Sequence, residues 1–180
     1  ESPFLLYFTT GLVHPAFKAM KKYMDMVDAE AIEIPPTKGP LEKHPHPADR
    51  YIRITKNCAK EFSDPMIRRI RHAYAAMIAE FDAIVGKLLD RLEALGLRDN
   101  TYVIFTSDHG EMAGEHNQVL KRTMYEPSSH IPLIISGPGI RHGAEGMIKK
   151  TKFNWKLNKI NIIIFIKNFQ NLNFSLTNFH

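Results

Sequence analysis

The apolar run at residues 102–105 constrains the fold of this chain most, because it predicts a buried strand. Chemically active residues follow this strand closely. Consecutive β-branched and aromatic residues are typical of a strand that is buried on both faces of a sheet. Asp108 and His109 follow this run after Thr106 and Ser107, and Gly110 gives the backbone freedom to turn there. In open α/β sheets ligands bind at the carboxyl ends of strands, so the sequence predicts a site here.

A long amphipathic helix is predicted over residues 65–95. Ser63 or Asp64 can cap its start, Pro65 suits its first turn, and Gly96 suits its exit. Apolar residues recur at steps of three and four and form one stripe, which we expect to be core: Ile67, Ile70, Tyr74, Met77, Phe81, Ile84, Leu88 and Leu92. The basic residues near its start are expected to face solvent: Arg68, Arg69 and Arg71.

The order of elements predicts an α/β fold. Two further strands are expected, a buried one at residues 4–9 and another at 131–135, on either side of the long helix and the central strand. Residues 16–64 are expected to run over the surface, with a short helix within 16–27. This alternation indicates a mostly parallel sheet with helices on both faces, present as an incomplete domain.

The composition changes abruptly in the C-terminal segment, so we divide the chain into residues 1–148 and an atypical tail, 149–180. The net charge of +5 derives from lysines in this acid-free tail: Lys149, Lys150, Lys152, Lys156, Lys159 and Lys167. No turn or crossover pattern places the apolar run 162–166 in the sheet, so we expect the tail to be poorly ordered or a non-native continuation. Scattered lysines do not indicate a nucleic-acid partner, and this short run does not indicate a membrane span.

The first residues and the cysteine content limit the kinds of protein that this sequence can represent. The sequence begins at Glu1 without an initiator Met and enters a strand pattern at once, so we expect a piece of a longer protein. The single cysteine, Cys58, excludes an internal disulfide framework and a cysteine-based metal cluster.

Several histidines and one lysine add candidate chemistry. His14 follows the first predicted strand, and His116 and Lys121 follow the central one. An imidazole can transfer protons and an ammonium can stabilise an anion. His44 and His46 flank a proline, where a solvated loop is the favoured interpretation and a metal site the alternative.

Taken together, these motifs resemble the second half of the catalytic domain of type I sulfatases, within the alkaline-phosphatase-like superfamily. The resemblance covers roughly residues 3–140 and rests on motifs that follow in order: His14-Pro15, Ser107-Asp108-His109-Gly110, Gly114-Glu115-His116, Lys121, Met124-Tyr125-Glu126, Ser129-His130-Ile131-Pro132-Leu133 and Gly137-Pro138-Gly139.

The resemblance implies roles for individual residues. Asp108 and His109 match two ligands of one divalent cation, usually Ca²⁺, although Ca²⁺ prefers oxygen ligands to an imidazole. Lys121 and His14 match catalytic residues that contact the sulfate and the leaving group. The same comparison implies substrate contacts for two further residues: His116 and His130.

Two parts of the family's site are absent from this sequence. The nucleophile is a formylglycine made within a Cys-x-Pro-Ser-Arg type motif, and the first aspartate pair of the metal site precedes it. Cys58 lacks the Pro and Arg of that motif and is expected to be an incidental or buried thiol. We therefore expect these 180 residues alone to be inactive.

For the complete protein, the resemblance implies hydrolysis of a sulfate ester on a carbohydrate, with the 2-sulfated glucuronate of glycosaminoglycans as a candidate, in the lysosome or outside the cell. It implies neither a nucleic-acid nor a membrane partner and leaves the oligomeric state open. A phosphoester or phosphonate hydrolase of the same superfamily remains an alternative. A catalytically inactive, truncated chain is the other alternative.

Overall fold

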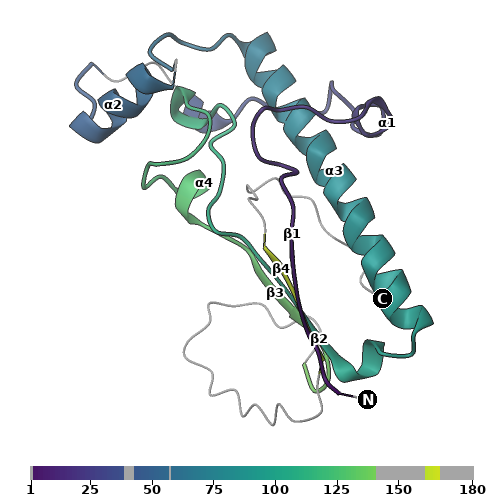
Figure 1. The fold of residues 1–180 in the computed structure, drawn as a ribbon. Helices are drawn as coiled ribbons and strands as arrows, with labels where there is room; N and C mark the ends of the chain where they lie inside the picture. Colours follow the sequence, from purple (N-terminus) through teal and green to yellow (C-terminus); the bar gives the residue numbers. More distant parts are fainter. Residues whose placement is uncertain (1, 39–42, 57, 141–160, 167–180) are drawn as a thin grey trace.

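A long helix lies along one side of a small sheet in the computed structural model, which describes residues 2–38, 43–56, 58–140 and, for its backbone, 161–166 (Figure 1). The strands are β1 (Leu5–Thr9), β2 (Thr101–Thr106), β3 (Leu133–Ser136) and β4 (Asn161–Ile166). The α-helices are α1 (Lys21–Met24), α2 (Pro47–Thr55), α3 (Asp64–Ala94) and α4 (Glu126–Ser129). Single 3-10 turns are η1 (Pro36–Lys38), η2 (Arg98–Asn100) and η3 (Glu115–Asn117).

The sheet mixes parallel and antiparallel pairs in the order β1-β4-β2-β3. Strand β4 is parallel to both β1 and β2, and β3 is antiparallel to β2. No sequence pattern placed the run 162–166 in the sheet, but its backbone pairs with a strand on each side. A short β-branched run suffices for such pairing, although no neighbouring turn pattern predicted its position.

Helix α3 has the predicted position and extends over 31 residues. The Ser63 side chain accepts a hydrogen bond from the amide of Met66, and Pro65 occupies the first turn. Gly96 follows the helix with a φ of 65°, which glycine adopts without strain. Four residues of its predicted stripe are buried in the main core with Val13 and Val103: Tyr74, Met77, Phe81 and Leu92. The ring of Phe81 packs against that of Phe105 with centroids 6.0 Å apart.

Arg71 differs from its predicted position on a solvated face of α3. Its side chain is buried, and its Nη1 lies 3.8 Å from Oε1 of Glu115 in η3. Burial lowers the pKa of the Arg71 guanidinium, and the carboxylates of Glu115 and Glu33 oppose this shift. The arginine therefore ties α3 to the loop that follows β2.

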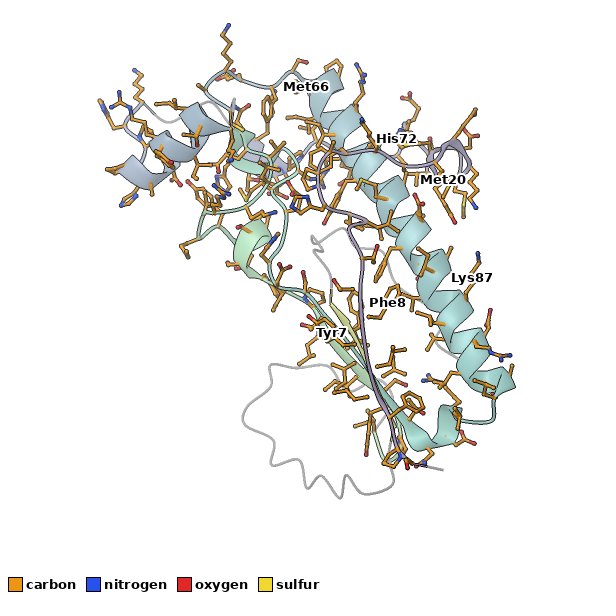
Figure 2. All side chains as sticks on the ribbon, in the orientation of Figure 1. Tyr7, Phe8, Met20, Met66, His72 and Lys87 are labelled. Carbon is orange, nitrogen blue, oxygen red and sulfur yellow. The ribbon has the colours of Figure 1, made fainter. Side chains whose placement is uncertain are left out.

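The predicted burial of β1, and of β2 on both faces, is not observed in the described residues. Phe8 lies between β1 and α3 and packs on the core, whereas Tyr7 lies on the side away from α3 (Figure 2). The exposed fractions are 66% for Leu5 and 57% for Tyr7. On β2, Val103 is buried and the alternate residues are half-buried. The reason is that α3 covers only one face of the sheet.

Residues 16–64 contain more structure than their sequence pattern predicts. Helix α1 has only four residues, but α2 has nine and was not predicted. His46 caps α2, because its Nδ1 accepts a hydrogen bond from the amide of Ala48 at 3.2 Å. Among the described residues no helix is both long and apolar enough to cross a bilayer.

Candidate functional site

The carboxyl ends of β1 and β2 lie at the same edge of the sheet, and the predicted site residues follow these two ends. Thr9 of β1 and Thr106 of β2 both pair with Ile166 of β4. Neighbouring strands are about 4.8 Å apart, so the two ends lie roughly 10 Å from each other. The loops that carry His14 and Asp108 therefore begin at the same edge of the sheet.

The structure brings His14 and Lys121 into direct contact. Nζ of Lys121 lies 3.0 Å from Nε2 of His14. The Nδ1 atom of His14 lies 2.7 Å from the carbonyl oxygen of Pro15, which can only accept a hydrogen bond. The neutral ring therefore carries its proton on Nδ1, and Nε2 accepts a hydrogen bond from the Lys121 ammonium.

Val13 anchors the loop that carries His14. Its side chain is fully buried in the main core, although its φ of 67° lies in the left-handed region. A β-branched residue rarely adopts this conformation, which persists only where the surroundings hold it. The core thus fixes the residue next to the exposed imidazole.

Asp108 and His109 each place one potential metal-ligand atom close to the other. Oδ2 of Asp108 lies 3.5 Å from Nε2 of His109. Oδ1 of Asp108 accepts a hydrogen bond from the His109 amide at 3.0 Å. Nδ1 of His109 donates to the carbonyl oxygen of Gly110 at 2.7 Å, which leaves the lone pair of Nε2 free.

This pair fits part of a metal shell. Two donors that bind one cation at about 2.0–2.6 Å each lie a few ångströms apart, as these do. The hydrogen bond from Nδ1 to a backbone carbonyl is the arrangement that usually orients a ligating imidazole. In the described part of the chain, no group of three or more His, Cys, Asp and Glu residues is placed to hold an ion, and a cation bound by this pair would need further ligands.

The other two predicted substrate contacts meet neighbouring residues at the start of α4. The His116 ring stacks on Tyr125 with centroids 3.9 Å apart and an interplanar angle of 11°. Nδ1 of His130 lies 2.6 Å from Oε1 of Glu126. Within the described residues, no hydrogen bond or ion pair joins either histidine to the His14–Lys121 pair.

Glu111 is a buried carboxyl that the sequence did not predict. An acidic residue two positions after His109 is equally typical of a solvated loop and of a buried site. It is only 1% exposed. Its Oε1 accepts hydrogen bonds from the amides of Leu120 and Ala113. Burial raises the pKa of Glu111 to about 7, while these hydrogen bonds and the Lys121 ammonium act in the opposite direction.

Asn117 is a second buried residue that was not predicted. Its Oδ1 accepts from the amide of Phe62, and its Nδ2 donates to the carbonyl oxygens of Lys60 at 2.8 Å and Cys58 at 3.4 Å. One side chain therefore fastens the loop after β2 to residues 58–62. Its φ of 54° lies in the left-handed region, which asparagine tolerates better than most residues.

Close packing also holds this loop against α3. Gly114 has a φ of 96°, and a Cβ atom there would lie 2.8 Å from Cγ2 of Ile67. Thr37 of η1 donates to the Glu115 carboxylate from the opposite side. The loop that ends at Lys121 is thus packed against three separate segments.

A groove of about 1020 Å³ lies away from these residues. It is formed by the start of α3, where Met66 and His72 lie, and by the segment around α1 (Figure 2). None of the predicted site residues lines this groove. The residues with the appropriate chemistry are instead at the sheet edge.

Comparison with known families agrees with the motifs at that edge. A family model described as Sulfatase matches residues 1–157. The chain therefore belongs to the sulfatase family.

Within the sulfatase family, the chain is similar to arylsulfatase K of several vertebrates. The chain is 43% identical over 152 residues to arylsulfatase K of Bos taurus, covering 77% of this chain and 28% of that protein. It is 42% identical over 158 residues to arylsulfatase K of Xenopus laevis, covering 81% and 29%. It is 40% identical over 156 residues to arylsulfatase K of Homo sapiens, covering 79% and 29%. The predicted resemblance to sulfatases is confirmed, and the chain spans less than a third of the length of these relatives.

A solved structure also matches part of the chain. It is described as BT4656 in complex with its substrate D-glucosamine-2-N,6-O-disulfate. The sequence identity is 35%, the TM-score is 0.40, and the match covers 51% of this chain and 19% of that one.

Proposed function

We propose that the complete protein hydrolyses the sulfate ester of a sulfated carbohydrate and that His14 and Lys121 act on the sulfate. The observation that carries this proposal is the 3.0 Å contact between Nζ of Lys121 and Nε2 of His14. Membership of the sulfatase family supports the reaction class. Because the chain covers 28% of a relative, the activity is proposed for the whole protein, and the 180-residue chain alone is expected to be inactive.

The pair combines an ammonium and an imidazole, which suits both binding and proton transfer. Lys121 places a positive charge where the sulfate oxygens accept hydrogen bonds. As the nucleophile from the rest of the protein forms its bond to sulfur, the bond between sulfur and the sugar oxygen breaks and the electron pair of that bond stays on the sugar oxygen. A proton from the His14–Lys121 pair then neutralises the leaving oxygen, which is general acid catalysis.

Asp108 and His109 are proposed ligands of one divalent cation, with Ca²⁺ as the family's usual ion. Their donor atoms, Oδ2 and Nε2, lie 3.5 Å apart and fit two positions of such a shell. When bound, the cation supplies positive charge beside the sulfate. The formylglycine nucleophile is proposed to come from a part of the protein outside this chain.

The substrate class and location are also proposals. We favour the 2-sulfated glucuronate of glycosaminoglycans and a lysosomal or secreted protein, because the chain is similar to arylsulfatase K. His116 and His130 are proposed sugar contacts, since they meet Tyr125 and Glu126 beside the same loop. Neither a nucleic acid nor a membrane is a proposed partner.

The complete domain is proposed to have helices on both faces of a mostly parallel sheet. Apolar and aromatic side chains such as Leu5 and Tyr7 are exposed on the face away from α3, which supports a covering layer there. The division into residues 1–148 and a tail, 149–180, is still a proposal, because the family model extends to residue 157 and β4 pairs with the sheet.

The test is an activity assay of the full-length protein with matched sulfate, phosphate and phosphonate esters. The sulfate ester is expected to be cleaved best. Lys121→Ala is expected to lower kcat by about 100-fold or more, because it removes a cation from the site of charge development. Lys87→Ala, which removes an exposed lysine of α3, is the control and is expected to keep the rate. Preference for a phosphoester, or no activity at all, would refute the proposal.

A further inference from the structure

Glu111 is a buried carboxyl that takes no part in the proposed chemistry, yet it joins the two arms of the loop that carries Lys121. On one side its Oε1 accepts hydrogen bonds from the amides of Ala113 and Leu120. Beside it, the Met112 amide donates to the carbonyl oxygen of Leu120 at 2.8 Å. The residue immediately before Lys121 is therefore held through both its amide and its carbonyl.

The backbone around Lys121 needs such support. Leu120 has a φ of 72° and Arg122 a φ of 87°, so the lysine lies between two residues in the left-handed region. Residues with side chains adopt this region at a cost and remain there only where other contacts hold them. The backbone turns at Leu120 and Arg122 direct the Lys121 side chain to His14, which lies in the loop after β1.

We propose that Glu111 is a positioning residue for Lys121: its hydrogen bond to the Leu120 amide sets the direction from which the ammonium reaches His14. The catalytic consequence rests on the function proposed above. The geometric consequence, the contact between Lys121 and His14, does not depend on that function.

Other contacts already secure the rest of this loop. The role of Glu111 in positioning Lys121 can therefore be separated from a role in the stability of the loop. Asn117 fastens it to residues 58–62, and the Gly114 amide donates to the carbonyl oxygen of Gln118 at 2.7 Å. Glu111 acts at the opposite end, next to Lys121. Loss of its carboxylate is expected to disturb the direction of Lys121 more than the fold of the loop.

The first test uses kinetics of the full-length protein with three variants. Glu111→Leu removes the acceptor, Glu111→Gln keeps one carbonyl oxygen for the Leu120 amide, and Gln118→Met is the matched control in the same loop. Gln118 is fully buried, and neither polar atom of its side chain has a partner in the described residues. Glu111→Leu is expected to lower kcat by about 100-fold with little change in KM, because a small misplacement of a catalytic group is costly. Glu111→Gln should restore part of that loss, and Gln118→Met should match the unmodified protein.

The second test reads the His14–Lys121 contact directly, by histidine-selective isotope labelling and NMR of the same full-length proteins. The Nε2 resonance of His14 is expected to lose the shift caused by the Lys121 hydrogen bond in Glu111→Leu, and to keep it in Gln118→Met. If Glu111→Leu does not fold, the shift of the His14 Nε2 resonance and the loss of kcat in Glu111→Gln decide whether the inference holds. An unchanged Nε2 resonance and an unchanged kcat in the folded Glu111 variants would overturn the inference. Absence of sulfatase activity alongside the expected NMR change would refute the proposed function only.

Discussion

Nζ of Lys121 and Nε2 of His14 lie 3.0 Å apart although 107 positions separate the two residues along the chain. Each residue belongs to a loop at the carboxyl end of a different strand, and each loop is fixed by buried residues of its own. Val13 anchors one loop in the core, and Glu111 binds the other. The contact is therefore a product of the sheet and of two separately supported loops.

A double-mutant cycle tests whether these two residues act as one unit. His14→Ala and Lys121→Ala are each expected to lower kcat/KM of the full-length protein, and the double variant to lose little more than the worse single variant. The expected coupling is about 1–3 kcal/mol, as for groups in contact. The same cycle between Lys121 and His130, which contacts Glu126, should be additive. Full additivity for His14 and Lys121 would contradict the contact.

Asn117 is expected to be a major contributor to stability. Its side chain bonds to the amide of Phe62 and to the carbonyl oxygens of Cys58 and Lys60, all in a buried environment. Asn117→Ala leaves these groups without partners and is expected to lower the free energy of unfolding by about 3 kcal/mol. Urea denaturation followed by circular dichroism measures this. Gln118→Met, the neighbouring buried amide, should cost far less, and an equal loss in both variants would contradict the assignment.

The Cys58 thiol is expected to be unreactive in the folded protein. It is fully buried, and burial raises its pKa above the ordinary 9.0, partly opposed by a backbone hydrogen bond involving Val119. Alkylation should therefore be slow in buffer and fast in denaturant, because the thiolate is the nucleophile.

The same pKa shift predicts a direction for stability against pH. Below the pKa of the unfolded thiol both states hold the proton and Cys58 has no effect. As pH rises above it, the unfolded thiol ionises while the folded one stays neutral, so stability falls. Cys58→Ala should remove this part of the alkaline loss. Rapid alkylation of the native protein at neutral pH would show that the thiol is accessible.

Removal of the proposed metal ligands should abolish cation binding in the full-length protein. Asp108→Ala and His109→Ala each remove one of the two donor atoms that lie 3.5 Å apart. Elemental analysis after dialysis is expected to show loss of the bound cation, and the thermal midpoint should no longer respond to a chelator. Asp99→Ala changes an exposed carboxylate before β2 and serves as the control. Retention of the cation in both ligand variants would contradict the assignment.

The sequence predicted those parts of the molecule that depend on local pattern. The helix over 65–95 followed from periodicity, from its cap at Ser63 and from Gly96, and α3 has these bounds to within one residue. The roles of Asp108, His109 and Lys121 came from motifs and are still proposals. The structure shows which donor atoms lie together, and activity and metal binding have to be measured.

Other features depend on contacts between distant segments, which periodicity does not contain. Arg71 lies in a basic cluster that favours a solvated face, but Glu115 and the packed loop cover it. Glu111 and Asn117 have polar side chains typical of loops, and only the backbone groups that they meet make them interior residues. Strand β4 was missed because pairing on both sides, not a turn pattern, determines its place.

The shared pairing of Thr9 and Thr106 with Ile166 has a consequence for evolution. Insertion of a single residue into β1 or β2 would exchange the two faces of that strand and move the following loop by about 3.3 Å relative to its neighbour. Descendants of this chain can therefore change length within 16–64 far more freely than within these two strands. We therefore expect the number of residues between each strand and the side chain that follows it, His14 after β1 and Lys121 after β2, to be inherited as strictly as these side chains themselves.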